Sequence, residues 1–451
     1  MPRSLPFTPG YFHGTSVVEW GRRLRQGHVS AVGLAQAALD SIARLDPLLN
    51  AFVHVNAQGA LAQAAAADAA LASGHDAGPL LGIPIAIKDN IDTADMPTTY
   101  GSAHFAVHRP ARDARCVQRL RDAGAVVLGK TLTHEFAYGP TGDRSLQGAS
   151  RNPWDDARMS GGSSAGSAVA VAAGLVPLAL GTDTGGSVRI PSGLCAAVGF
   201  KPGHGVVPMD GVFALSSTLD HVGVIAQDVS GTALVFAALD ESGARCPSAV
   251  AAPRVGWIDP QLFGPHQAAV TAAVKCFAEQ IFAQPMTPLD GFDAWVPALK
   301  TAVTAIQRAE AYAVHQQRVA RAPQHFDPEV LERLRLSAEV RGWEYVSAMK
   351  TRQALIEATA GLFRQVDLLV LPTLPVTAPL LQQREVQVQG TRLAVRDALL
   401  SLTSAWNLTG LPAISVPAGQ VDGLPVGLQV VAARGQEWAL LGALQRSLVA
   451  A

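Results

Sequence analysis

The sequence reads RMSGGSSAGS over residues 158–167 and GTDTGGSVRIP over residues 181–191. Between these segments lie an Ala- and Val-rich stretch typical of a helix and the short apolar run Leu178–Leu180, typical of a buried strand. Glycines let a backbone approach a ligand closely and adopt dihedral angles that other residues resist. We therefore expect two Gly/Ser-rich turns on either side of one helix and one strand. The amides of the second turn can converge on one point, as a developing oxyanion requires: those of Thr184, Gly185, Gly186 and Ser187.

The hydroxyl that ends the second turn, Ser187, would lie beside this oxyanion hole and could act as a nucleophile. Serine is a weak nucleophile until a base removes its proton. His204 is the histidine nearest to the two turns, and it follows them in the chain. A lysine that burial keeps neutral is the alternative. Lys88 ends the apolar run Gly82–Ile87, so we expect it at the mouth of a strand, half in the core.

Three other segments of the chain match catalytic sequence motifs, and each has an ordinary structural interpretation. Gly124–Thr131 fits the phosphate loop GxxxxGK[ST], but its Ala-Val-Val-Leu core favours a buried strand over an open turn. Gly162–Gly166 fits the nucleophile elbow GxSxG around Ser164, yet the preceding Asp155–Gly161 is polar and is predicted to be flexible. Ser347–Lys350 fits SxxK, but the partner motifs SDN and KTG are absent from the sequence.

Composition excludes several classes of protein. The 451 residues are 49% apolar and 16% charged, against a usual charged share of about 25%, so the chain can bury a large core. Lys+Arg 35 against Asp+Glu 36 leaves a net charge of −1 without a basic block, which argues against nucleic acid as a partner. The longest apolar stretch, 168–180, is shorter than the ~20 residues of a membrane span. We expect a soluble, cytoplasmic protein without a membrane segment.

Cysteines and histidines show no metal-ligand spacing. The four cysteines are scattered without a CxxC pair, so they are predicted to be buried, reduced thiols. The twelve histidines include no HExxH motif. We therefore expect neither a metal nor a cofactor.

Together, the run Gly82–Asp89, the turn at 161–167 and the segment Gly181–Pro191 resemble the amidase signature family, serine amidases with a Ser-cisSer-Lys triad. The resemblance covers most of the chain and is weakest in the helical middle. Further agreement comes from Gly129–Thr131 with Glu135–Phe136, Cys195–Pro202, Ser217–Gly223, Asn407–Ala413 and Gly423–Gln429.

The resemblance implies an α/β fold with three layers (α/β/α), in which a large mixed β-sheet forms the core and helices cover it. One domain would span 1–451. We expect an N-terminal helical segment (1–74), a catalytic core (75–245), a mostly helical insertion (246–360) and a C-terminal part that completes the sheet (361–451). Apolar runs predict strands at Ile83–Ile87, Ala125–Leu128, Leu178–Leu180, Val366–Leu371, Ala413–Val416 and Val426–Ala432.

By the same resemblance, Ser187 would be the acylated nucleophile, Ser163 the bridging serine at a cis peptide bond and Lys88 the general base. Three residues would support them: Ser164 by hydrogen bonding near Lys88, and Asp183 with Arg189 by holding the turn. The substrate would be a small carboxamide or urea-like compound, cleaved to an acid and ammonia or an amine. Candidates for the substrate pocket, chosen because they lie near motif segments, are Gly161, His134, Tyr138, Phe213 and Trp406.

The family also contains glutaminase subunits of tRNA-dependent amidotransferases, which need a partner chain. This sequence departs from them in the segment Lys130–Glu135, which has Leu-Thr-His where those subunits resemble Asn-Met-Asp. It also lacks their tyrosine-rich middle stretch. These two differences favour a stand-alone amide hydrolase acting on a small molecule, and they leave room for a homodimer. Ala165, where glycine is frequent in the family, is a mild change in a turn. An elbow-type esterase and an inactive binding scaffold stay as further alternatives.

Overall fold

The computed structural model describes residues 4–243, 252–286, 288–289, 292 and 295–450. Within these residues, ten strands form one mixed sheet in the order β1-β3-β2-β6-β8-β7-β13-β14-β10-β9. In chain order the strands are β1 (Phe52–Val55), β2 (Pro84–Lys88), β3 (Val126–Thr131), β6 (Leu178–Thr182), β7 (Val198–Lys201), β8 (Val222–Ala226), β9 (Val255–Trp257), β10 (Leu368–Pro372), β13 (Ala413–Val421) and β14 (Leu424–Ala432). Two small hairpins lie outside this sheet: β4 (Arg151–Asn152) with β5 (Asp155–Met159), and β11 (Glu385–Val388) with β12 (Thr391–Ala394).

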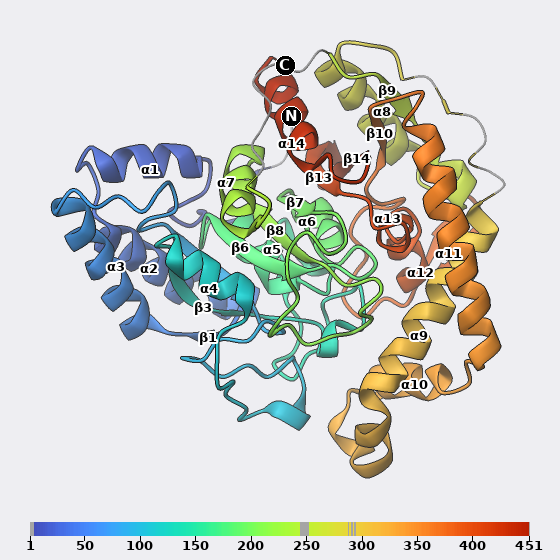
Figure 1. The fold of residues 1–451 in the computed structure, drawn as a ribbon, viewed down its shortest axis with the longest axis horizontal. Coiled ribbons are helices and arrows are strands. Elements are labelled where there is room, and N and C mark those ends of the chain that lie inside the picture. Colours follow the sequence, from blue (N-terminus) through green and yellow to red (C-terminus); the bar gives the residue numbers. More distant parts are fainter. Residues whose placement is uncertain (1–3, 244–251, 287, 290–291, 293–294, 451) are drawn as a thin grey trace.

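Helices lie on both sides of the sheet (Figure 1). They are α1 (Val17–Arg25), α2 (Ala31–Leu49), α3 (Ala57–Ala72), α4 (Arg115–Asp122), α5 (Ala165–Ala172), α6 (Arg189–Cys195), α7 (Val229–Leu239), α8 (Ala268–Phe282), α9 (Val296–Arg321), α10 (Pro328–Ser337), α11 (Gly342–Leu362), α12 (Val395–Leu400), α13 (Ala405–Leu408) and α14 (Glu437–Ala450). Helices α1–α3 lie at one end of the molecule and α9–α11 at the other.

Strand β14 shows how the layers are built. Successive side chains of a strand point to opposite faces. Leu428 and Val430 belong to a core cluster that also contains apolar residues of α8 and α14. Val431 belongs to a second cluster, shared with α9 and α11, and Gln429 on this same face accepts a hydrogen bond from Arg189 of α6. The sheet is therefore enclosed between two helical layers, and the predicted α/β/α architecture is confirmed.

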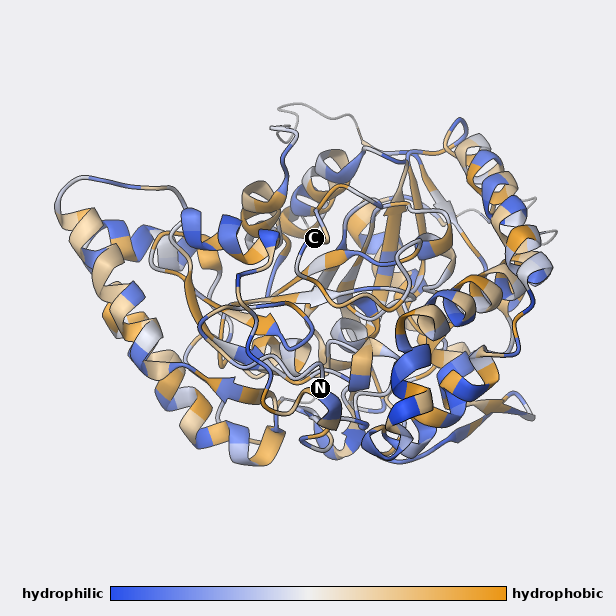
Figure 2. Ribbon diagram, turned by 60° about the horizontal axis from the view of Figure 1, so that its bottom comes forward, coloured by the Kyte–Doolittle hydropathy of each residue, from blue (hydrophilic) through white to orange (hydrophobic). Residues whose placement is uncertain are grey.

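Each of the six apolar runs named from the sequence forms a strand of the main sheet, within a few residues of the predicted bounds. The predicted N-terminal helical segment contains one exception, β1, which pairs antiparallel with β3 at the edge of the sheet. The middle of the chain is helical over α8–α11 but also supplies β9, which pairs parallel with β10. Figure 2 shows the sheet strands as largely hydrophobic, whereas the outer helices alternate hydrophobic and hydrophilic residues.

The prediction of a flexible segment before the first Gly/Ser turn is wrong. Asp155–Met159 forms β5, which pairs antiparallel with β4 in a short hairpin. This hairpin lies outside the main sheet, so β5 does not supply the central strand that a nucleophile elbow requires. Among the residues described, no helix is both long and apolar enough to cross a bilayer.

The topology brings the two Gly/Ser turns together. Strands β2 and β6 are parallel neighbours, so their carboxyl ends meet at one edge of the sheet. Lys88 is the last residue of β2, and Thr182 is the last residue of β6. The first turn leads into α5 and the second into α6, and these two helices pack against each other.

Candidate active site

Lys88 lies at the carboxyl end of β2 with no exposed surface, deeper than its expected place half in the core. Its Nζ lies 2.7 Å from Ser163 Oγ, 2.7 Å from Thr182 Oγ1 and 3.5 Å from the Thr182 carbonyl oxygen. All three partners are neutral oxygens. Burial disfavours the charged ammonium and lowers the pKa of Lys88 from 10.5 to about 7, although the charges of Asp183 and Asp220 oppose this shift.

The carboxylates around Lys88 are engaged with other groups. Asp89 accepts hydrogen bonds from Thr99 and lies 3.8 Å from the ammonium of Lys130. Asp183 pairs with Arg189, and Asp220 accepts a hydrogen bond of 2.6 Å from the hydroxyl of Thr184. No carboxylate in the described part of the chain forms an ion pair with Lys88, so the more distant charges of Asp183 and Asp220 offset only part of the cost of burying its charge.

The first turn presents Ser163 to this amine. The peptide bond between Gly162 and Ser163 is cis, and Gly161 before it has a φ of +76°, which favours glycine. Ser164 donates from its backbone amide to the carbonyl of Ser187 at 3.1 Å, so the two turns lie side by side. The Ser164 hydroxyl donates to the carbonyl oxygen of Thr182 at 3.1 Å. Ser164 thus contacts the residue that Lys88 itself contacts.

A fully buried ion pair holds the second turn. Asp183 accepts from the backbone amides of Gly186 at 2.8 Å and Val188 at 3.1 Å, and it pairs with both Nε and Nη2 of Arg189. The guanidinium beside Asp183 holds the pKa of that carboxyl well below its usual range, despite burial. Arg189 has three more acceptors: the carbonyl of Thr403 and the side chains of Gln429 and Asn407.

The expected oxyanion hole needs one correction, at Gly186. Its amide donates to Asp183 and is therefore unavailable to a substrate. Within the described residues, the amides of Thr184, Gly185 and Ser187 have no acceptor in the chain. Gly186 has a φ of +135°, and a Cβ at this position would overlap Thr403 Oγ1. Its requirement for glycine therefore comes from the shape of the turn.

Ser187 opens into a small pocket and is itself 6% exposed. Of the five residues predicted to line a pocket, Tyr138 lines this one. The residues around the pocket are Ala137, Tyr138, Gly139, Pro140, Thr184, Gly185, Ser187, Leu215, Gln307, Arg396 and Leu400. Sequence reasoning missed Leu215, Gln307, Arg396 and Leu400, because they come from segments without a motif and reach the pocket through tertiary packing.

The other four pocket candidates lie elsewhere. Gly161 is buried beside α6, and His134 donates its backbone amide to the Ser163 carbonyl at 3.1 Å while its ring packs over Gly139. Phe213 stacks in an aromatic cluster, 4.4 Å from Tyr100 between ring centroids.

The prediction for Trp406 is wrong. Its indole is fully buried in the second core cluster and donates to the carbonyl of Leu402 at 3.0 Å. Large aromatic side chains contribute much apolar area to a core, and nearness to a motif in sequence does not distinguish this role from a pocket wall.

Residues that could hold a metal do not gather at this site. In the part of the chain with described coordinates, no group of three or more His, Cys, Asp or Glu side chains lies in a ligating arrangement. Cys116 and Cys195 are buried as predicted, whereas Cys276 is exposed on α8; Cys246 lies outside the described residues.

The fold that carries these two serine-bearing turns is the fold of an amidase of solved structure, so the chain has the architecture of an amide-hydrolysing enzyme. The chain belongs to the amidase family, whose profile matches residues 34–278 and 293–441. This match confirms the resemblance seen in the sequence.

Several relatives cover nearly the whole chain. It is 38% identical to the A-type subunit of the glutamyl-tRNA(Gln) amidotransferase of Acidothermus cellulolyticus, over 92% of this chain and 90% of that protein. It is 34% identical to AtzE of Pseudomonas sp., which is named as part of a 1-carboxybiuret hydrolase, over 92% and 94%.

Solved structures agree with the sequence matches. A crystal structure of an amidase has a TM-score of 0.90 at 34% identity, covering 97% of this chain and 99% of that one. The peptide amidase from Stenotrophomonas maltophilia has a TM-score of 0.80 at 30% identity, covering 98% and 97%.

Replacing Lys88 by methionine tests the electrostatics of the site. The pKa of Lys88 is lower in the folded protein than in the unfolded chain, so the unfolded chain binds more protons between about pH 7 and 10.5. The stability of the native protein relative to Lys88→Met therefore rises with pH in this window, by up to about 1.4 kcal/mol per pH unit. Urea denaturation between pH 7.5 and 9.5 measures this difference.

Lys350→Met is the matched control, because Lys350 is exposed on α11. Its stability difference from the native protein stays constant over the same pH range. A pH-independent difference for Lys88→Met would show that Lys88 keeps an ordinary pKa.

Proposed function

We propose that this protein hydrolyses amide bonds through an acyl-enzyme, with Ser187 as nucleophile, Ser163 as proton relay and Lys88 as general base. The observation that carries the proposal is the 2.7 Å contact between Lys88 Nζ and Ser163 Oγ, at a lysine without a carboxylate partner. A base works best when its pKa lies near the working pH, and burial lowers that of Lys88 to about 7.

The hydrogen bonds of Lys88 favour one direction of proton flow. A neutral amine has two N–H donors and one lone pair. The carbonyl oxygen of Thr182 can only accept, and its hydroxyl oxygen lies 2.7 Å from the amine, so the two donors suit Thr182. The lone pair is then left for the hydroxyl of Ser163. Ser163 gives its proton to Lys88 as it takes one from Ser187.

The chemical steps follow from this relay. Ser187 Oγ forms a bond to the amide carbon while its proton passes through Ser163 to Lys88. The negatively charged carbonyl oxygen accepts hydrogen bonds from the free amides of the second turn, those of Thr184, Gly185 and Ser187. The C–N bond then breaks, and the leaving amine takes the proton back along the same path. Water, activated in the same way, releases the acid from Ser187.

Asp183 and Arg189 act on this reaction through the shape of the turn. Asp183 binds the amides of Gly186 and Val188, which flank Ser187 in the chain. Arg189 ties the same carboxylate to α12–α13 and β14 through Thr403, Asn407 and Gln429. The pair is a positioning element, and nothing in its hydrogen bonds requires contact with the substrate.

We propose a small carboxamide or urea-like compound as the substrate. The pocket at Ser187 is small, which favours such a molecule. The relative named as part of a 1-carboxybiuret hydrolase supports the urea-like class. We further propose that residues 1–451 work as one catalytic domain, because β1 near the N-terminus and β14 near the C-terminus belong to the same sheet.

A fluorophosphonate probe tests the nucleophile. The native protein takes one adduct at Ser187, and Ser187→Ala takes none; peptide mass spectrometry locates the adduct. Ser163→Ala and Lys88→Met label at least about a hundredfold more slowly, because the proton has no acceptor. In the native protein the labelling rate rises about tenfold per pH unit below pH 7 and levels off above it, as Lys88 loses its proton.

Ser347→Ala is the control, since Ser347 is exposed on α11, belongs to the SxxK spelling and takes no part in the proposed relay. It labels at the native rate. An adduct at Ser164 instead of Ser187 would support the elbow-type esterase. The absence of any adduct would support an inactive scaffold, and either result would end the proposal.

A second candidate is an A-type amidotransferase subunit that needs a partner chain. The several relatives named as A-type subunits of glutamyl-tRNA(Gln) amidotransferases favour it. The purified chain alone, assayed on amides, ureas, aryl anilides and glutamine, separates the two candidates. We expect turnover of a small amide or urea that exceeds that of glutamine. Turnover of glutamine that appears only with an added partner chain would favour the second candidate.

A further inference from the structure

The charge at the pocket of Ser187 is positive. Arg396 on α12 is the charged residue among the side chains described around it, and the others are apolar or neutral. Gln307 of α9 lies beside it. Arg396 and Gln307 also line a neighbouring cavity between α9 and α12, which shares Gly185 and Leu400 with the first pocket. Arg396 therefore lies between the reacting serine and a second space that can hold the rest of a substrate.

The guanidinium of Arg396 is poorly satisfied by the protein. Its Nη2 donates to Gln307 Oε1 at 3.2 Å. Its Nη1 lies 3.7 Å from a carboxylate oxygen of Asp397, which is beyond hydrogen-bond distance. Its Nε is buried and has no partner among the residues described. Since a guanidinium carries five N–H donors, several of them are available to a ligand.

A second guanidinium adds to this positive potential. Arg333 of α10 donates from Nη1 to the carbonyl oxygen of Tyr138, a residue of the same pocket. No ion pair within the described residues involves Arg333. Burial, together with the charge of Arg396, lowers the pKa of Arg333 from 12.5 to about 10.

The carboxylates of this region are already engaged. Glu329 pairs with both Arg144 and Arg384, and Asp143 pairs with Arg384. Asp397 is half-exposed and lies 3.4 Å from the ammonium of Lys300. These pairs leave Arg333 without an ion-paired carboxylate among the described residues, and they leave Arg396 with only the 3.7 Å approach to Asp397. An anionic ligand would supply the hydrogen-bonded negative charge that both guanidinium groups lack.

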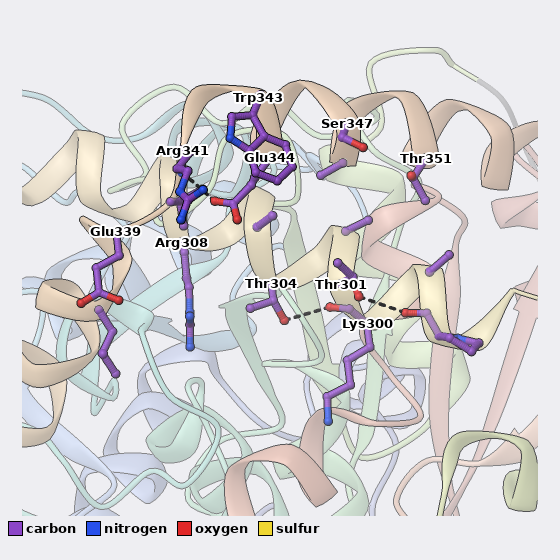
Figure 3. Close-up of a pocket in the computed structure, with 17 residues that line it drawn as sticks. Lys300, Thr301, Thr304, Arg308, Glu339, Arg341, Trp343, Glu344, Ser347 and Thr351 are labelled. Atoms are coloured by element: carbon purple, nitrogen blue, oxygen red, sulfur yellow. Dashed lines mark hydrogen bonds between the residues drawn. The ribbon is translucent and has the colours of Figure 1, made fainter.

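A groove between α9 and α11 provides a contrast (Figure 3). It has charges of both signs, including Arg308, Arg341, Glu339 and Glu344. It shares no residue with the pocket at Ser187, and Glu344 is already used to accept a hydrogen bond from the backbone of Arg341 at 2.7 Å. The positive charge that lacks a hydrogen-bonded carboxylate is therefore that of Arg396 and Arg333, at the pocket of Ser187.

We propose that the amide substrate of this protein carries a carboxylate, which Arg396 binds while the scissile amide lies at Ser187. This inference rests on the proposed function. A planar guanidinium matches a carboxylate with two parallel N–H donors, and such charge-assisted bonds are stronger than neutral ones. Gln307 accepts a hydrogen bond from Arg396 and so fixes one edge of its guanidinium. Arg333, which is hydrogen-bonded to the carbonyl oxygen of Tyr138, adds positive potential near the pocket. Arg396 is thereby the residue that selects anionic over neutral amides.

Two matched pairs of amides test this selection. Glutaramate against pentanamide places the carboxylate on the acyl side, and N-acetyl-β-alanine against N-propylacetamide places it on the leaving side. In at least one pair, kcat/KM of the native protein is about 10- to 100-fold higher for the anionic amide. Arg396→Gln brings this ratio close to one, mainly through KM. Arg396→Lys restores part of it, because the charge returns without the second donor.

Arg392→Gln is the matched control, because Arg392 is exposed on β12 and pairs with Glu385. It keeps the native ratio. Equal kcat/KM within both pairs, or a native ratio in Arg396→Gln, would overturn the inference. If Arg396→Gln does not fold, as judged by its circular dichroism, the native ratios and Arg396→Lys still decide the matter. Failure of the proposed function is seen separately, as native protein that takes no fluorophosphonate adduct at Ser187.

Discussion

The desolvation of one amine is the constraint on which the rest of the site depends. Lys88 has no exposed surface and is surrounded by neutral oxygens, so its charged form is disfavoured by on the order of 5 kcal/mol relative to water. A carboxylate in contact with Nζ would reverse this effect. The fold gives the three nearby carboxylates other partners: Thr99 and Lys130 for Asp89, Arg189 for Asp183, and Thr184 for Asp220. The neutral state of Lys88 is thus a property of the whole surrounding network.

A buried ion pair also shapes the turn that ends at Ser187. Asp183 accepts hydrogen bonds from two backbone amides of the turn and pairs with the Arg189 guanidinium. The conformation of this segment is therefore tied to a buried ion pair that reaches three later residues, Thr403, Asn407 and Gln429. Breaking a buried pair by removing one partner leaves an uncompensated charge and costs several kcal/mol. Asp183 uses the amide of Gly186, whereas the amides of Thr184, Gly185 and Ser187 have no acceptor among the described residues. Within this short segment, the amides that hold the turn are therefore distinct from those that we propose for the oxyanion hole.

Much of the fold and of this site could be predicted from the sequence, because each part has a local signal. Continuous apolar runs between Gly and Pro predicted six strands, and a lysine at the end of one of them was expected beside a serine turn. β1 was missed because a four-residue strand between two long helical patterns has too weak a periodicity to stand out. The role of Gly186 was missed because its amide is claimed by a side chain, Asp183, and composition does not reveal such competition.

The substrate side of the site was largely beyond sequence reasoning. Gln307 and Arg396 come from helices without any motif, α9 and α12, and tertiary packing brings both to the pocket at Ser187. Trp406 shows the converse error, in which a residue next to a motif serves the core. Motifs mark where the backbone is constrained, whereas pockets are assembled from distant segments whose contacts only tertiary structure defines.

The central claim concerns the protons on one nitrogen, and neutron diffraction from crystals soaked in heavy water at about pH 8.5 observes them directly. We expect two deuterons on Lys88 Nζ, both directed at Thr182, and the hydroxyl deuteron of Ser163 on the line towards Nζ. Three deuterons on Nζ, with the Ser163 deuteron directed elsewhere, would contradict the account.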